Sequence, residues 1–159
     1  MLNKNNSKLI QLALFFHKKG HIYFLKRKRS IILNLFFKCI NFFFIRLILF
    51  GEIPYETKIG DNLRLPHGFN GVILNKNAVI GKNVTLYHQV TIGSNDPKVE
   101  GKKFGVPVIE NNVIIGAGAK IIGPIIIGEN SRIAPNSLVR ENIPSNSIVY
   151  SETKIKIKR

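Results

Sequence analysis

The sequence has few of the residues that build cross-links or metal centres. Its single cysteine, Cys39, excludes an internal disulfide and suits a reducing compartment. No Cys/His spacing typical of zinc is present and no carboxylate cluster suggests a metal, so we expect none. No small-residue cleavage site follows an apolar stretch of the right length, which argues against a signal peptide. These absences favour a metal-free cytoplasmic protein.

Acidic residues are missing from the first third of the chain. Residues 1–50 contain ten Lys/Arg and no Asp or Glu, and the first acidic residue is Glu52. The remaining residues carry fourteen basic and nine acidic side chains, so most of the net charge of +15 lies at the N-terminal end. This change in sign predicts a boundary near Gly51. We divide the chain into a basic segment (1–50), a central domain (51–147) and a basic tail (148–159).

The basic segment ends in a long apolar run, "IILNLFFKCINFFFIRLILF". Its twenty residues match the length of a membrane span. However, Lys38 and Arg46 lie inside it, and each would cost about 2.5–3.5 kcal/mol near a bilayer centre. On a helix, Asn34, Lys38 and Asn41 form one polar stripe. The pattern therefore favours an amphipathic helix over a spanning one.

The partner of this segment is left open among three alternatives. We expect one basic amphipathic helix, or two helices broken near Gly20, on the inner face of the membrane, with "KRKR" at 26–29 beside anionic headgroups. Packing of the apolar faces on each other or on a neighbouring subunit is one alternative, and a true span is the other. Nucleic acid is not expected as a partner, because the cations alternate with Phe, Ile and Leu and no nucleic-acid-binding motif is present.

After Gly51 the sequence repeats every six residues. Six consecutive hexads, "IENNVI", "IGAGAK", "IIGPII", "IGENSR", "IAPNSL" and "VRENIP", each open on an aliphatic residue and place a small or aliphatic residue fifth. A period of six is typical of a parallel β-helix, in which three short faces make one coil and the opening residue points inward. Gly and Asn recur where the corners need positive φ. The sequence therefore predicts an all-β solenoid behind a helical N-terminal segment.

Two interruptions of this period mark candidate functional positions. Seventeen positions separate Ile92 from Ile109, which predicts a loop over residues 94–107. A three-residue insertion near 71–73 follows His67, which stands in "LRLPHGFNG" between a proline and a glycine. A regular solenoid usually carries its function where it is interrupted.

Together with the hexads and His67, the stretches "TLYHQVTIG" and "IGAGAKIIGPIIIGENSRIAPNSLV" make residues 52–147 resemble the serine acetyltransferase family. These are hexapeptide-repeat acyltransferases. In its basic, apolar N-terminal segment the chain is most similar to short members from surface-polysaccharide gene clusters. The resemblance implies a left-handed parallel β-helix, acetyl-CoA as co-substrate, and a homotrimer with active sites between neighbouring prisms.

The resemblance also implies roles for individual residues. His67 falls on the catalytic histidine, the general base, and Glu52 falls on the aspartate that orients it. The coenzyme A contacts fall near Ala117 and Arg132, with the residues around Gly93 and Ser94 lining the same groove. An imidazole suits this chemistry because an alcohol attacks a thioester only as its proton is removed. His88 in "LYHQV" is predicted to line the cleft or to be structural, and is otherwise the alternative base.

The positions that hold serine in the family differ here. Pro66 replaces an aspartate, and Gly105 and Val106 replace an arginine–histidine pair. A zwitterionic amino acid needs a carboxylate for its ammonium group and a cation for its carboxylate. We therefore expect acetyl transfer to a sugar hydroxyl of a capsular or surface polysaccharide or its precursor. Serine O-acetylation in cysteine biosynthesis is the alternative, followed by a non-catalytic trimeric scaffold.

Overall fold

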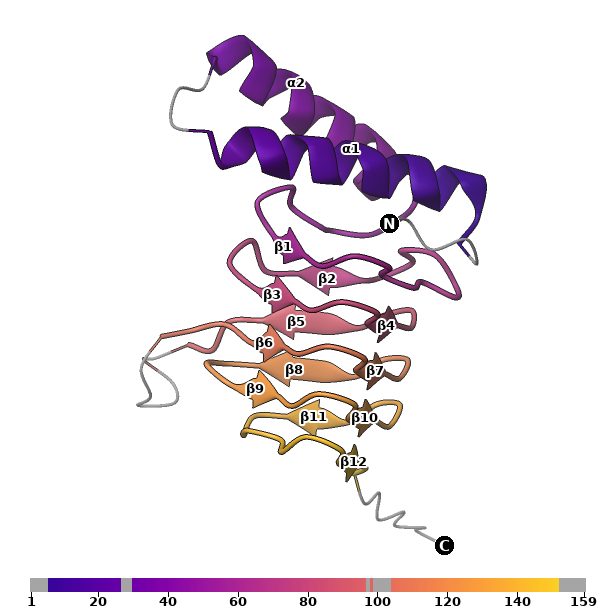
Figure 1. The fold of residues 1–159 in the computed structure, drawn as a ribbon, viewed down its shortest axis with the longest axis vertical. Helices are drawn as coiled ribbons and strands as arrows, with labels where there is room; N and C mark the ends of the chain where they lie inside the picture. Colours follow the sequence, from indigo (N-terminus) through magenta and orange to yellow (C-terminus); the bar gives the residue numbers. More distant parts are fainter. Residues whose placement is uncertain (1–5, 27–29, 97, 99–103, 152–159) are drawn as a thin grey trace, which may run out of the picture.

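The computed structural model describes residues 6–26, 30–96, 98 and 104–151, and shows a triangular prism of stacked coils capped by helices (Figure 1). Three parallel sheets form the sides, with strand orders β1-β3-β6-β9, β12-β10-β7-β4 and β11-β8-β5-β2. Successive strands in the chain lie in different sheets, so the backbone winds as a parallel β-helix. The cap and β12 lie at opposite ends of the stack.

The helices and strands are as follows: α1 (Lys8–Phe24), α2 (Ile31–Asn41), η1 (Phe42–Ile48, π-helical), β1 (Lys58–Ile59), β2 (Ile73–Leu74), β3 (Val79–Ile80), β4 (Thr85–Leu86), β5 (Thr91–Gly93), β6 (Val108–Ile109), β7 (Ile114–Ile115), β8 (Lys120–Ile122), β9 (Ile126–Ile127), β10 (Arg132–Ile133), β11 (Leu138–Val139) and β12 (Ile148–Val149). The ladder continues through β12, two residues beyond the boundary predicted at 147. Residues 152–159 of the predicted basic tail lie outside the described residues.

The interior of the prism follows the hexad pattern. The opening aliphatic residues are at most 2% exposed: Ile80, Leu86, Ile92, Ile109, Ile115, Ile121, Ile127, Ile133 and Val139. The small fifth residues Ala119, Ser131 and Ser137 are fully buried beside them. Fully burying one such aliphatic side chain contributes about 1.5–3 kcal/mol, so the column of openers is the main source of stability. The predicted solenoid is confirmed in its repeat and its strand pairing.

One corner of the prism is a ladder of asparagines. Asn62, Asn83, Asn112, Asn130 and Asn146 all have positive φ, between 57° and 65°. Their side-chain amides hydrogen-bond from coil to coil at 2.9–3.1 Å. Asparagine tolerates the left-handed backbone better than other non-glycine residues, and each amide both donates and accepts. The corners predicted from Gly and Asn are therefore confirmed here, with side-chain bonds added.

The three-residue insertion lies closer to His67 than the sequence indicated. Arg64 pairs with Thr85 and Ile73 with Thr91, so the offset between coils falls from 21 to 18 between these pairs. The Gln89 N–H donates to the Asn70 carbonyl, which restores the ladder already at Gly71. The extra residues therefore lie before Gly71, and the prediction of 71–73 was wrong. The hexad pattern misplaced them because Phe69, inside the insertion, is itself fully buried.

Helix α1 runs unbroken through Gly20, so the predicted break there is wrong. The two helices are instead separated by residues 25–30. A Cβ at Gly20 would lie 3.2 Å from Tyr55 Cβ and 3.3 Å from the Phe37 ring. Glycine at this position therefore permits the close approach of α1, α2 and the first coil, instead of ending a helix.

Side chains from α1 close the top of the prism. The Asn6 side chain, just before the helix, donates to the Leu63 carbonyl and accepts from the Leu65 N–H, at 2.9 and 3.0 Å. His17 Nε2 donates to the Pro54 carbonyl at 3.0 Å. These bonds satisfy backbone groups that have no further coil above them. The apolar side of α1 adds Ile10, Ala13 and Leu14 to the prism core.

His17 predicts a pH-dependent stability. Burial lowers its pKa from 6.5 to about 4, against the opposing hydrogen bond to Pro54, and His21 lowers it further. Between these values the unfolded chain binds the proton and the folded chain does not, so stability is lost as the pH falls from about 6.5 to about 4. The loss is on the order of 3 kcal/mol. We expect this fall in urea titrations across the window, and a smaller one in His17→Gln. An equal fall in that variant would contradict the assignment to His17.

Candidate functional site

His67 stands exposed at the corner between the sheet of β4 and the sheet of β2 and β5. The turn is fixed by the Gly68 N–H, which donates to the Leu65 carbonyl at 3.1 Å, and by the positive φ of Gly68. Leu65 and Phe69 on either side are buried and anchor the turn in the core. The imidazole is therefore held outward by a short, well-anchored segment, as a group that meets substrate must be.

The rings of Tyr87 and His88 lie next to His67 in the coil below. The His67 ring centroid lies 5.1 Å from that of His88, edge to face, and 5.8 Å from that of Tyr87. The Gly118 N–H donates to the His88 carbonyl, which stacks Ala117 beneath His88. His88 Nδ1 is buried and has no hydrogen-bond partner among the described residues. The corner thus presents His67, His88 and Ala117 in one column.

Glu52 is engaged elsewhere. Its carboxylate accepts from Arg46 of η1 at 3.0 Å, and both side chains are more than half exposed. Among the described residues, no hydrogen bond joins Glu52 to His67. Glu52 lines a cavity of about 420 Å³ with Lys38, Arg46 and Glu56, and His67 is not part of its lining. The structure therefore does not bring together the two residues predicted to form the catalytic pair.

The predicted coenzyme-binding residues fall into two groups on one chain. Ala117 lies in the His67 column, and Arg132 is exposed in β10 on the adjoining sheet, where it pairs with Ile114. Gly93 is the last residue of β5. Gly93 and Ser94 therefore lie at one edge of the sheet that contains β2 and β5, and Ala117 lies at the other edge. The chain continues from there into the predicted loop over 94–107, of which residues 97 and 99–103 lie outside the described residues. Its described ends leave the stack on one side of the prism (Figure 1). One copy of the chain does not gather all four residues into one cleft.

The loop returns to the prism at the position where the resemblance would require arginine. The Gly105 N–H donates to the buried Asn95 side chain at 3.0 Å. A Cβ at Gly105 would clash with Pro124 Cβ. Any larger side chain would therefore have to shift the loop or the coil below. Pro66, the residue directly before His67, is exposed and provides no charge beside it.

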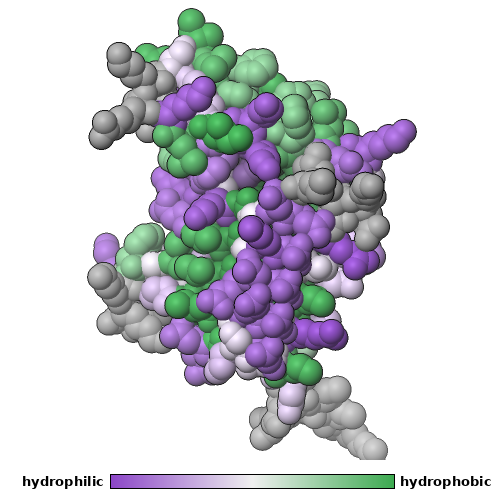
Figure 2. Space-filling view, in the orientation of Figure 1, coloured by the Kyte–Doolittle hydropathy of each residue, from purple (hydrophilic) through white to green (hydrophobic). Residues whose placement is uncertain are grey.

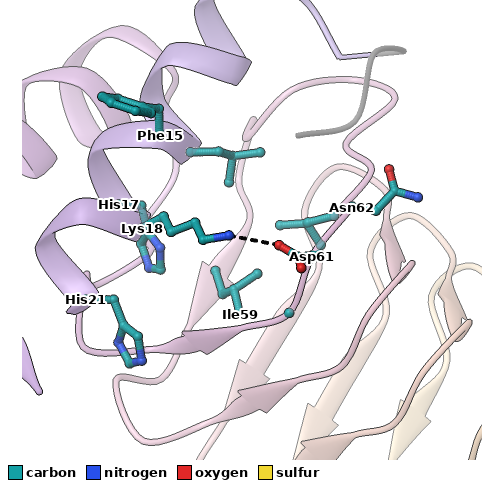
Figure 3. Close-up of a pocket in the computed structure, with 10 residues that line it drawn as sticks. Phe15, His17, Lys18, His21, Ile59, Asp61 and Asn62 are labelled. Atoms are coloured by element: carbon teal, nitrogen blue, oxygen red, sulfur yellow. Dashed lines mark hydrogen bonds and ion pairs between the residues drawn. The ribbon is translucent and has the colours of Figure 1, made fainter. Parts of the chain in front are cut away.

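A separate cavity of about 250 Å³ lies between α1 and the first coil, and His67 is not part of its lining (Figure 3). His17, Lys18 and His21 approach it from the helix, and Ile59, Asp61 and Asn62 from the coil. The Lys18 ammonium and the Asp61 carboxylate meet at 2.9 Å. Within the part of the chain that is described, no group of three or more His, Cys, Asp or Glu could hold a metal ion.

Comparison with known proteins identifies relatives of the prism. Residues 107–141 match the family described as "Bacterial transferase hexapeptide (six repeats)". The serine acetyltransferase of Helicobacter pylori strain J99 is 40% identical over 102 residues, and that of Staphylococcus aureus strain Mu50 is 44% identical over 98. Residues 107–141 thus match the repeats of this family, and 64% and 62% of the chain aligns with these two serine acetyltransferases. The predicted resemblance to serine acetyltransferases is confirmed.

Solved structures of serine acetyltransferases are similar to this chain over most of its length. Serine acetyltransferase isoform 3 of Entamoeba histolytica, in complex with cysteine, has a TM-score of 0.77 at 28% identity over 97% of this chain. Neisseria gonorrhoeae serine acetyltransferase, in complex with serine, has a TM-score of 0.71 at 29% identity over 91%. The chain spans 57% and 44% of the two bacterial relatives named above, and 52% and 55% of these two structures.

The contact between His67 and His88 is the feature of the hexapeptide-repeat domain that the sequence left open. The two histidines are 21 residues apart, which is one coil of eighteen plus the three-residue insertion. That spacing was the available signal. Both placements of the insertion, before Gly71 and at 71–73, lie between the two histidines, so this spacing aligns them in neighbouring coils in either case.

Proposed function

We propose that this protein transfers the acetyl group of acetyl-CoA to a hydroxyl group, with His67 as the general base. The observation that carries the proposal is the exposed His67 imidazole, anchored at the interrupted corner of a serine-acetyltransferase-like prism. A ring nitrogen of His67 removes the acceptor hydroxyl's proton as its oxygen attacks the thioester carbon. The tetrahedral intermediate then expels the coenzyme A thiolate, which takes the proton. Backbone N–H groups of the turns stabilise the oxyanion.

Glu52 orients His67 in this proposal, and to do so its carboxylate must leave Arg46. An exposed ion pair of this kind contributes about 0–1 kcal/mol, so the rearrangement costs little. A carboxylate beside the second ring nitrogen fixes the tautomer and stabilises the imidazolium. Glu52 is therefore a positioning residue that acts through His67.

L-serine is the acceptor that the comparisons favour, because every relative named above is a serine acetyltransferase. This support is stronger than that for the polysaccharide acceptor favoured by the sequence. A sugar hydroxyl remains the second candidate on one observation: Gly105 packs on Pro124 where a carboxylate-binding arginine would be needed. The two acceptors share the same donor and the same base.

A homotrimer with a left-handed coil completes the proposal. One chain presents His67 and Ala117 at one edge of a sheet and Gly93 and Ser94 at the other. Packing prisms side by side brings one copy's first edge against a neighbour's second edge. Each coenzyme-binding cleft then draws residues from two copies, as the family resemblance implies.

The test is release of coenzyme A from acetyl-CoA by the purified protein, with L-serine and a panel of de-O-acetylated polysaccharides as acceptors. Efficient release with serine and none with the polysaccharides supports serine O-acetylation. The reverse result supports the sugar hydroxyl. No release above the acceptor-free rate with any acceptor would contradict acetyl transfer to these classes.

A further inference from the structure

The outer face of α2 and η1 is an exposed apolar surface that the proposed chemistry does not use. Its residues are between 50% and 86% exposed: Ile31, Ile32, Leu35, Phe36, Phe42, Phe43 and Leu47. The stretch Ile31–Ile48 is long and apolar enough to cross a membrane, and only 6% of it is buried inside the structure. Apolar side chains gather over the helical end of the molecule (Figure 2). A soluble monomer rarely exposes so large a contiguous apolar surface.

The helix turns its two asparagines, Asn34 and Asn41, toward the protein. Asn34, half-buried, accepts a hydrogen bond from the Tyr55 hydroxyl, and Asn41 lies in the same row with its side-chain nitrogen buried. Phe37 packs on Tyr23 and Phe44 on Phe16, with ring centroids 5.6 and 5.9 Å apart. The inner side is thus fixed by contacts to α1 and the first coil. The opposite side, which would be polar if it faced water, carries the outer face.

Charge decides between the possible occupants of this face. Residues 1–50 carry ten Lys/Arg and no acidic residue, and Lys26 and Lys38 are exposed. A second copy docking through the same face would bring two such segments together and oppose like charges. An anionic surface is complementary to them. Arg46, near the end of the same helix, is already paired with Glu52 of the first coil.

We propose that the outer face docks on an anionic phospholipid surface, with α2 and η1 lying in the headgroup region. The helix lies along the surface in this proposal and does not span, because Lys38 lies near the middle of Ile31–Ile48 and would place a charge near the bilayer centre, where charges are strongly disfavoured. The cap is at one end of the stack, so the prism projects away from the lipid (Figure 1).

The proposal is tested by co-sedimentation of the full-length protein with vesicles. One set contains phosphatidylcholine alone and the other a mixture with phosphatidylglycerol. We expect binding to the anionic vesicles to be at least about tenfold tighter, and to weaken as salt is added, because several cations contribute near the surface. Equal binding to both sets, or binding to neither, overturns the proposal.

Two double variants distinguish binding through the outer face from nonspecific adsorption of the protein to vesicles. Leu35→Gln with Phe43→Gln removes two of its apolar side chains and is expected to weaken binding at least about tenfold. Ile126→Gln with Leu138→Gln changes two exposed residues of the prism and is expected to bind like the parent. Sedimentation equilibrium tests the alternative that the outer face joins copies of the chain. If the first pair lowers the assembly mass and leaves vesicle binding unchanged, the face joins copies of the chain and the proposal is wrong.

Discussion

His67→Ala is expected to lower kcat/KM for acetyl transfer by about 10²–10⁴-fold, the usual contribution of a general base. The side chain is exposed at a turn whose anchors, Leu65 and Phe69, are untouched. The free energy of unfolding should therefore change by no more than about 0.5 kcal/mol, as for other surface substitutions. The measurement is coenzyme A release with whichever acceptor the release assay selects. Thermal unfolding is measured on the same preparations.

Two further variants test whether that loss of activity reflects the role of His67 as the base. His21→Ala removes an imidazole at the cap and should retain transfer. Glu52→Gln should lower kcat with little change in KM, because Glu52 acts through His67 and does not bind substrate. If His67→Ala keeps most of its activity, the base is elsewhere, and His88, whose ring lies 5.1 Å from that of His67, becomes the first residue to replace.

Ile127→Ala is expected to lower the free energy of unfolding by about 2–5 kcal/mol, as other large-to-small core substitutions do. Ile127 is fully buried and is paired with Ile109 above and Ile143 below. The prism is narrow, so the coils cannot collapse around the missing methyl groups without losing their register. Urea unfolding followed by circular dichroism measures the difference.

Ile126→Ala is the matched control for this prediction. It removes the same atoms from the same strand, but Ile126 is 47% exposed and points outward. Its effect should be about 1 kcal/mol or less. Equal losses in the two variants would mean that the outer face of β9 is as tightly packed as the interior, and would contradict the assignment of stability to the inner column.

The prism could be predicted because its rule is local. A period of six determines which residues point inward, and the narrow interior leaves little freedom to choose others. The insertion was misplaced because Phe69 is buried without belonging to any hexad. The break in the N-terminal helices was also misplaced. Glycine is a residue type that often ends a helix. Only the close approach of Tyr55 and Phe37 explains why Gly20 lies inside α1.

The site was predicted residue by residue but not as an arrangement. His67 was found because it stands at an interruption, and its exposure agrees with that prediction. The pairing of Glu52 with Arg46 was not, because the partner comes from a helix that the repeat pattern does not describe. The spread of Gly93 and Ala117 to opposite edges of a sheet follows from coil geometry, which a linear alignment does not contain.

The two ends of the stack differ in a way that bears on filament growth. Each end of a β-helix offers unpaired backbone groups and exposed coil edges on which another molecule could continue the winding. At the upper end Asn6 and His17 occupy that position and α1 blocks the approach. At the lower end, β12 pairs with β10 alone among the described strands, and Ile148 and Tyr150 are exposed within that part of the chain. Head-to-tail polymerisation needs both ends, so a cap at one of them limits end-to-end association to pairs.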